Sequence, residues 1–388
     1  MFFQYFIWGV WLPLLFGYLG PEGLNFSATQ QTLILISFPV SALFSVFFGN
    51  QFADRNFDAE KFLAASHLIS GLAMLGLYFS TSFNSFLLFM WLHALLFVPT
   101  TSVANSVLFA AMKNPKREYG FIRLGGTFGW MSASWPMFFL LSNEPMAARN
   151  TFMVAAVASF TFAVFSLTLP YTPANRSNQG LAWWQAIKSL GLPFVFVLWI
   201  VAMLDSSTHD LYFMWSGSFI ASIGVDAKWI MPIMSIGQLA EIASMFAIGA
   251  VLAKLGWKWT LIIGVSGQVA RFAIFAFFPQ LPMVIFAIAL HGMFYAFFFA
   301  TLFIFVDEFL PKEIRASAHG IFNFMMLGGG PIISRLIAPG LFKQHSSTTN
   351  GVVSVDFSSL FLYPLAISIV AILLLLCAFR PPKETAQV

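Results

Sequence analysis

The residues best suited to chemistry lie inside long apolar stretches of the sequence, where charged side chains are scarce. Glu241 is the one carboxylate in the apolar run from about Trp229 to Leu252, and Gln238 precedes it by three residues. This spacing puts the amide and the carboxylate on one face of a helix. A charge at bilayer depth costs at least about 2.5–3.5 kcal/mol on the insertion scale. Glu241 is therefore either satisfied inside a helix bundle or part of a substrate and proton site.

A second apolar stretch, residues 117–142, carries a guanidinium, a hydroxyl and an indole at helical spacing. Arg123, Thr127 and Trp130 follow one another at intervals of four and three residues, so they share one face. Arginine keeps its charge in almost any environment. Arg123 therefore needs a carboxylate, a ligand or water, unless its side chain reaches the lipid headgroups.

A third stretch, residues 192–220, holds three ionisable groups within six positions. Asp205 and His209 are four residues apart and form either a proton-handling pair or a satisfied structural pair. Asp210 and Phe213 lie on the neighbouring stripe of the same helix. No further His or Cys lies nearby in the sequence, so we predict no metal site here.

Two more polar groups share a face in residues 281–306. His291 and Tyr295 are four residues apart. A histidine at this depth either hydrogen-bonds within the bundle or takes part in function. The sequence offers no partner for His67, His93, Arg271 and Arg335, and no functional role is assigned to them.

The composition identifies the setting of these groups as a membrane. Hydrophobic residues make up 59% of the 388 positions and charged residues only 9%, too few to cover a soluble surface. The bases lie in loops between apolar runs, which argues against a nucleic-acid partner. The single cysteine, Cys377, excludes an intrachain disulfide. Residues 2–19 are predicted to be a retained span and not a signal peptide, and the absence of a polar leader suggests that the true start lies upstream.

The apolar runs predict an all-α membrane protein with twelve transmembrane helices in two halves of six. A polar stretch separates the sixth span from the seventh, which is typical of transporters built from repeats. The predicted domains are an N-terminal half (1–170), a cytoplasmic linker (171–191) and a C-terminal half (192–388). The predicted spans are about 2–19, 30–50, 61–80, 85–111, 117–142, 148–170, 192–220, 228–253, 258–278, 281–306, 316–342 and 358–380.

The distribution of basic residues predicts the orientation of the spans. Most of the 19 Lys and Arg residues fall in loops on one side of the predicted spans. Because loops rich in Lys and Arg stay in the cytoplasm, both termini and the central linker are predicted to be cytoplasmic, in a bacterial cytoplasmic (inner) membrane.

The loop after the second span resembles the conserved loop of the major facilitator superfamily. Gly49 is followed by Asp54 and Arg55, with Lys61 beyond, and Asn50 stands at the usual glycine position. An acid and a base in such a loop can hold the two halves together in one state and release them in the other. Asp54 and Arg55 are therefore the predicted conformational loop residues.

Stretches along nearly the whole chain resemble the nucleoside:proton symporter family of that superfamily. The span-eight and span-eleven stretches are the most specific of them. They are Gln4–Trp11, Val98–Thr100, Ile122–Trp130, Ser235–Glu241, Leu290–Gly292 and Ile314–Gly320.

This resemblance implies a substrate site and two departures from it. It implies that Arg123, Thr127, Gln238 and Glu241 bind a nucleoside, with Trp130 and Tyr295 against its base or ribose. Family members usually have an acid directly after the span-ten aromatic, where this chain has Ala296. They also usually have amides in span seven, at the positions of Asp210 and Phe213.

The sequence thus predicts a transporter that imports a nucleoside with a proton by alternating access. The predicted substrate set adds Asp210, Phe213 and His291 to the residues above. Glu241 is the predicted proton acceptor, with Asp210 and His209 in proton coupling. No cofactor is predicted, and the expected form is a monomer in the lipid bilayer. The alternatives are a symporter for a sugar or other small polar metabolite, a membrane-embedded enzyme, for which no nucleophile–His pair is found, and a transport-dead sensor.

Overall fold

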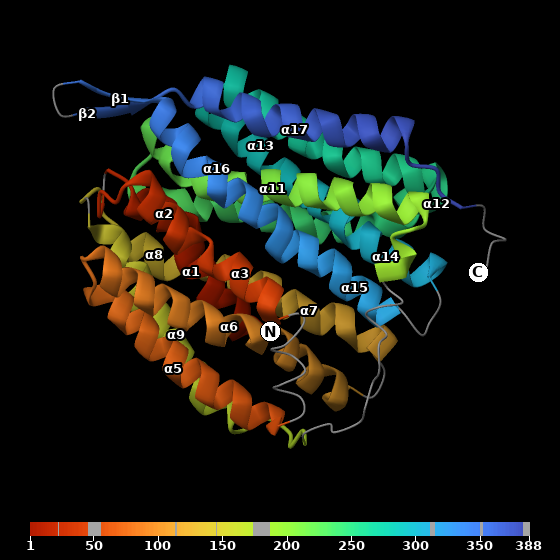
Figure 1. Cartoon of the computed structure of the whole chain (residues 1–388), viewed down its shortest axis with the longest axis horizontal. Coiled ribbons are helices and arrows are strands. Elements are labelled where there is room, and N and C mark those ends of the chain that lie inside the picture. The colour runs from red at the N-terminus through yellow and green to blue at the C-terminus, as the bar shows by residue number, and fades with distance from the viewer. Residues whose placement is uncertain are drawn as a thin grey trace. The chain divides into compact units, whose positions relative to one another are not determined.

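The computed structural model is built almost entirely of helices, with one short β-hairpin (Figure 1). It describes residues 1–21, 23–45, 56–112, 115–144, 146–173, 187–310, 315–349 and 352–382. The chain divides into two compact units. The first comprises Met1–Asn178 and Phe213–Ser235, and the second comprises Gln179–Tyr212 and Ile236–Val388. Helices α11 and α12 each contribute residues to both units.

The first unit is a bundle in which α1 packs on α7 and α9, and α5 packs on α6 and α9. A capping box starts α2, since the Ser27 hydroxyl accepts from the Gln30 backbone N–H while the Gln30 side chain accepts from the Ser27 N–H. The elements are α1 (Phe2–Leu19), α2 (Ala28–Leu35), α3 (Ser37–Phe44), α5 (Ala59–Phe79), α6 (Phe83–Ala111), α7 (Pro115–Ser132), α8 (Ser134–Leu140), the 3₁₀ turn η2 (Ala147–Arg149) and α9 (Asn150–Ser166).

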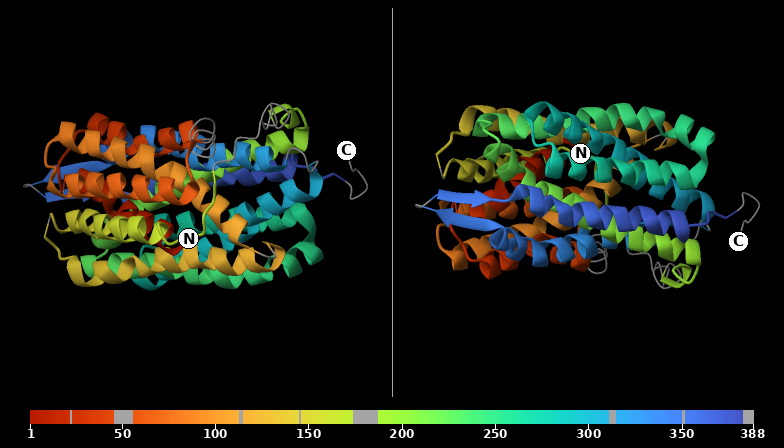
Figure 2. Two further views of the ribbon diagram at one scale, coloured as in Figure 1. Left: turned by 90° about the horizontal axis from the view of Figure 1, so that it is seen from below. Right: turned by 90° about the horizontal axis from the view of Figure 1, so that it is seen from above.

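The second unit contains the hairpin and the remaining helices, except for the end of α11 from Phe213 and the start of α12 up to Ser235. The segments η3 and η4 are π-helical. Strands β1 (Ser346–Thr349) and β2 (Val352–Val355) pair antiparallel with Ser346 opposite Val355, and Figure 2 shows them extending beyond the helices that they join. The helices are α11 (Pro193–Ser222), α12 (Ala227–Phe277), α13 (Leu281–Phe294), η3 (Tyr295–Ala300), α14 (Thr301–Phe309), α15 (Arg315–Asn323), η4 (Phe324–Gly329), α16 (Gly330–Gln344) and α17 (Phe357–Cys377).

The core of the second unit is aromatic and aliphatic. Phe294, Phe298 and Phe305 are buried among Leu198 of α11 and Leu261 of α12. Each such side chain gains about 1.5–3 kcal/mol by leaving water in a soluble protein. In a lipid bilayer, close packing and internal hydrogen bonds hold helices together instead.

The helical, membrane-type fold predicted from the sequence is confirmed. Helix α12 covers two predicted spans, 228–253 and 258–278, and its regular geometry is interrupted at Gly256, where φ is 72°. Glycine adopts a positive φ without strain, so the chain changes direction there at a single residue. Among the described residues, nine helices are long and apolar enough to cross a membrane. The number twelve and the domain limits remain predictions, and residues 174–186 of the predicted linker lie outside the described part of the chain.

Candidate functional site

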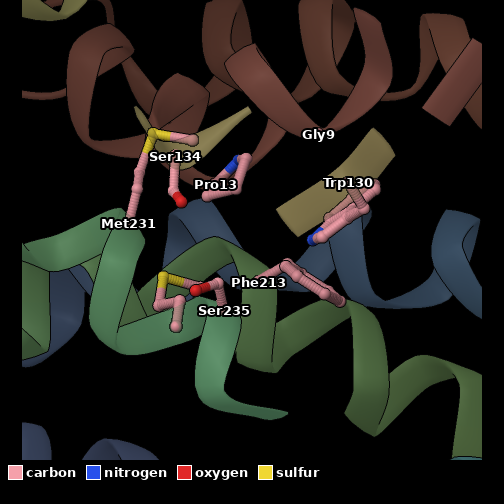
Figure 3. A pocket seen from close by; sticks show the side chains of 8 residues that line it. Gly9, Pro13, Trp130, Ser134, Phe213, Met231 and Ser235 are labelled. Carbon is pink, nitrogen blue, oxygen red and sulfur yellow. The ribbon is translucent and has the colours of Figure 1, made fainter. Parts of the chain in front are cut away.

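A narrow pocket lies within the first unit and brings together two of the predicted site residues (Figure 3). Trp130 of α7 and Phe213 of α11 face each other edge to face, with ring centroids 5.5 Å apart. The pocket has a volume of about 10 Å³, which is room for roughly one water molecule. Its lining residues are Gly9, Pro13, Trp130, Ser134, Phe213, Met231, Met234 and Ser235.

Helix α1 supports the Trp130 ring. Gly9 packs directly on the indole, since a Cβ there would lie 3.0 Å from a ring carbon. Trp8 meets the same ring edge to face at 5.7 Å. Helix α7 itself approaches α1 closely, because Gly129 lies against the Phe2 backbone. The predicted aromatic platform is therefore held rigidly by one neighbouring helix.

Arg123 and Thr127 lie on the same helix as Trp130. Helix α7 begins at Pro115, a residue favoured in a first helical turn, which places Arg123 about two turns inside it. Thr127 is half-buried.

In the second unit, Gln238 and Glu241 lie on the turn of α12 that packs against α13. Gln238 is buried and Glu241 half-buried. Gly292 lies against the backbone of Glu241 so closely that any Cβ there would overlap it. Gly237 in turn packs on His291, since a Cβ added at Gly237 would lie 3.1 Å from the His291 Cβ. The carboxylate-bearing turn of α12 and the His291 turn of α13 are therefore in direct backbone contact.

Tyr295 begins the π-helical segment that follows this contact. Its half-buried ring meets Phe299 edge to face at 5.8 Å. Ala296, at the position where relatives usually carry an acid, is fully buried.

His291 belongs to a buried polar cluster that the sequence did not reveal. Its Nδ1 lies 2.9 Å from Nη1 of Arg271, and Arg271 also donates to the Gln268 side chain. The guanidinium sits 4.0 Å above the Tyr212 ring, and the ring of His209 stacks on His291 at 5.0 Å. Because a guanidinium has no acceptor atom, Nδ1 of His291 must accept, and the proton of its neutral ring is on Nε2.

Asp210 lies in a different environment on the same helix. Arg335 of α16 donates to both carboxylate oxygens, at 2.7 Å from Nη2 and 3.0 Å from Nε, and Ser334 donates at 2.7 Å. Both charged side chains are almost completely buried. The geometry of Asp210 is that of a saturated ion pair.

The two histidines left without a role by the sequence also find partners, in the first unit. His67 Nε2 lies 3.2 Å from Gln4 Oε1, and Gln4 donates to Thr100 at 2.9 Å. His93 Nδ1 lies 2.6 Å from the Ser70 hydroxyl. Each histidine thus uses one ring nitrogen, while His67 Nδ1 and His93 Nε2 are buried and make no hydrogen bond with the described residues.

Two predictions concern parts of the chain that the structure does not describe. Asp54 and Arg55 lie outside the described residues. The side chain of Arg123 likewise lies outside the described part of the structure, so its role in nucleoside binding stays a prediction. Within the described residues, no group of three or more His, Cys, Asp or Glu side chains could hold a metal ion.

A helical membrane fold with polar groups buried inside its helices is typical of a secondary transporter. The family described as nucleoside H+ symporter matches residues 1–384, and this chain belongs to that family. The crystal structure of the nucleoside transporter NupG is similar, with a TM-score of 0.83 and 24% identity over 98% of this chain and 97% of that one.

Two curated relatives from Escherichia coli strain K12 cover most of both chains. The putative nucleoside transporter YegT is 25% identical over 398 residues, which is 97% of this chain and 91% of the relative. The xanthosine permease is 25% identical over 362 residues, which is 87% and 85% respectively. The predicted family, fold class and transport function are confirmed, and the protein is a multi-pass membrane transporter of a small molecule and not an enzyme.

Proposed function

We infer that this transporter binds its nucleoside with side chains of α7, α12 and the α13–η3 segment and couples import to proton movement. The observation that carries this proposal is the contact of Gly292 with the Glu241 backbone. It brings a carboxylate and the Gln238 amide beside the turn that bears His291 and Tyr295. A nucleoside needs a few fixed polar groups and an aromatic face, and this set offers both.

The roles follow from the chemistry of each side chain. Gln238 and Glu241 supply hydrogen bonds to ribose hydroxyls or base edges, and Tyr295 supplies an aromatic face. Trp130 and Phe213, edge to face in the first unit, are the second aromatic element. Arg123 and Thr127 join the set through the family resemblance alone.

Glu241 is the proposed proton acceptor, with His209 as a proton-handling neighbour of His291. Asp210 was predicted for both substrate binding and proton coupling. Its hydrogen bonds with Arg335 and Ser334 favour a structural role, which is to hold α16 against α11. His291, bonded to Arg271, is placed to orient the α13 turn beside the substrate.

The proposed transport mechanism is alternating access. Two halves, 1–170 and 192–388, would work around one central site, joined by the linker 171–191, with Asp54 and Arg55 as a conformational loop. The proposed setting is the bacterial inner membrane, with both termini in the cytoplasm. The proposed form is a monomer.

The proton role is tested in proteoliposomes with labelled uridine. Glu241→Gln should abolish accumulation driven by a pH gradient while retaining exchange of uridine across the membrane. Glu308→Gln is the matched control, since it makes the same change at an exposed position near the end of α14. Full accumulation by Glu241→Gln would refute the role of Glu241.

The substrate is tested by thermal stabilisation of the purified protein across nucleosides and sugars. Nucleosides should raise the unfolding temperature, because a ligand that binds only the folded state stabilises it. Stabilisation by sugars alone would contradict the proposal and favour a sugar symporter.

A further inference from the structure

The most unusual buried group in the second unit is the carboxyl group of Asp205 on α11. Its side chain has no exposure to solvent, and neither carboxylate oxygen has a hydrogen-bond donor among the described residues. A buried carboxylate without donors is very costly as an anion, whereas the neutral acid is much cheaper to bury.

Two donors in the same cluster also lack an acceptor. Nε of Arg271 and Nε2 of Gln268 are buried and make no hydrogen bond within the described part of the chain. Both residues are completely buried and lie within electrostatic or hydrogen-bonding range of Asp205. An acid and two donors, none of them in a hydrogen bond of normal geometry, thus lie within interaction range of one another.

The surroundings of Asp205 contain several other ionisable groups. The Asp210–Arg335 pair lies on another face of α11, since five residues advance a helix by about 140° beyond a full turn. The groups that face the cluster are His209 and Tyr212 from α11, Arg271 from α12 and His291 from α13, and the backbone of Glu241 touches α13 next to His291.

We propose that Asp205 is a second proton-binding site of the transporter, separate from Glu241. In the structure seen here Asp205 is a neutral carboxylic acid, and Arg271 is engaged by His291 and Gln268. When the acid gives its proton to water, the carboxylate accepts hydrogen bonds from Arg271 Nε and Gln268 Nε2. One O–H bond breaks and the proton leaves as hydronium, while the two unsatisfied donors gain an acceptor.

This exchange connects the proton to the substrate site. If Arg271 turns toward Asp205, its hydrogen bond to His291 lengthens or breaks. His291 lies on the α13 turn that packs against Glu241. Release of the proton from Asp205 thereby loosens the support of the turn that carries the proposed nucleoside contacts. The inference rests on the proposed function for its role in transport, but proton binding itself does not.

Proton binding is tested first without transport or substrate, by infrared spectroscopy of the purified protein. Wild-type protein should show the carbonyl band of a protonated carboxylic acid, and Asp205→Asn should lose it. The matched control is Ser368→Ala on α17, which removes a buried hydroxyl that donates to the Pro364 carbonyl of its own helix and should leave the band in place. An unchanged band in Asp205→Asn would overturn the proposal.

A conservative variant covers the case in which Asp205→Asn does not fold. Asp205→Glu keeps an ionisable group, so its carboxylic acid band should move in frequency and not vanish. A band identical to wild type in Asp205→Glu would also overturn the assignment.

The role in transport is tested by counting protons taken up per uridine in proteoliposomes. Asp205→Asn should carry about one proton fewer per uridine than wild type, because a carboxyl group binds one proton. A ratio equal to that of wild type would show that Asp205 takes no part in coupling. If the wild type moved uridine without protons, the proposed function would fail, and the infrared result would still decide whether Asp205 binds a proton.

Discussion

Helix α11 carries two buried aspartates five residues apart, and their carboxyl groups differ in the hydrogen bonds that they receive. Asp210 receives hydrogen bonds from Arg335 and Ser334 to both of its oxygens. Asp205 receives none among the described residues, although Arg271 lies within electrostatic range. Arg335 donates its hydrogen bonds to Asp210. Arg271, in contrast, donates to His291 and Gln268.

The difference shows that burial alone does not identify a working carboxylate. A saturated ion pair has its charge already compensated, so changing its protonation would cost the whole network. An acid without hydrogen-bond donors, next to a donor without an acceptor, can exist either as the neutral acid or as a hydrogen-bonded carboxylate. A switch requires two such states. The number of donors that reach each oxygen therefore separates the structural group from the functional one.

The largest expected effect comes from breaking the saturated pair. Asp210→Ala should lower the unfolding free energy by about 3–5 kcal/mol, because it leaves the Arg335 guanidinium buried without a counter-charge. The measurement is unfolding of the purified protein in detergent. Replacing both partners with apolar residues, Asp210→Leu with Arg335→Met, should recover most of the loss. If Asp210→Ala alone were as stable as wild type, Asp210 would not have the structural role that distinguishes it from Asp205.

A smaller effect is expected where α13 meets α12. Gly292→Ala places a Cβ into the Glu241 backbone, and overpacking of this kind costs about 1–3 kcal/mol. It should also reduce uridine uptake, since it moves His291 and with it Arg271, without altering any ionisable group. Gly340→Ala is the control, because a Cβ there meets open space. If Gly292→Ala took up uridine as wild type does, the Arg271 cluster would not be needed to support the substrate site.

A still smaller change in stability is expected from the unsatisfied acid. Asp205→Asn should alter the unfolding free energy by less than about 1 kcal/mol at neutral pH, because no hydrogen bond of the observed arrangement is lost. The same unfolding assay in detergent measures it beside Asp210→Asn, which should be far more harmful. A loss as large as that of Asp210→Asn would mean that Asp205 is an ionised structural partner.

The smallest effect is expected at an exposed aspartate, which serves as the reference for the two buried ones. Asp356 caps the start of α17 by accepting from the Ser359 backbone N–H at 3.1 Å, and hydrogen bonds with Ser359 lower its pKa. Asp356→Ala should cost about 0.5 kcal/mol, the low end for an N-cap, because the site is exposed and screened.

The pH dependence of this small effect has a defined sign. A lowered pKa stabilises the folded state above the pKa of the unfolded chain, and the benefit is lost as the pH falls through the folded pKa. The difference between wild type and Asp356→Ala should therefore shrink below about pH 4. Unfolding temperatures measured between about pH 3 and pH 7 test this, and a difference that grew on acidification would contradict it.

The sequence predicted most of the helices because hydrophobic runs of about 20 residues have few alternatives in a membrane. The predicted span 2–19 coincides with α1 at Phe2–Leu19, and the span 281–306 begins where α13 begins, at Leu281. The predicted break between the spans 228–253 and 258–278 also falls where the structure has it, because the two helices of α12 meet at a kink at Gly256. The positive φ of that residue absorbs the turn within a single position.

The polar partners were much harder to predict than the helices. Asp210 and Arg335 are 125 positions apart, and no spacing rule links residues on helices so distant in sequence. The same holds for Arg271 and His291, whose contact depends on how α12 and α13 approach. Gly237 and Gly292 were the available signal, since small residues on two helices permit close backbone contact. The neighbours of these glycines, His291 for Gly237 and the Glu241 backbone for Gly292, become visible only in three dimensions.

The π-helical segment η3 has a consequence for any comparison of this chain with its relatives. A π turn holds one more residue than an α turn, and each residue of an α-helix accounts for about 100° of rotation. Beyond Ala300, side chains of α14 therefore face a direction about 100° away from the one that plain counting from His291 gives. Deleting a single residue between Tyr295 and Ala300 would convert the π turn into an α turn and leave the side chains of α14 facing the same neighbours. Sequences aligned here without a gap would match residues that point to different neighbours.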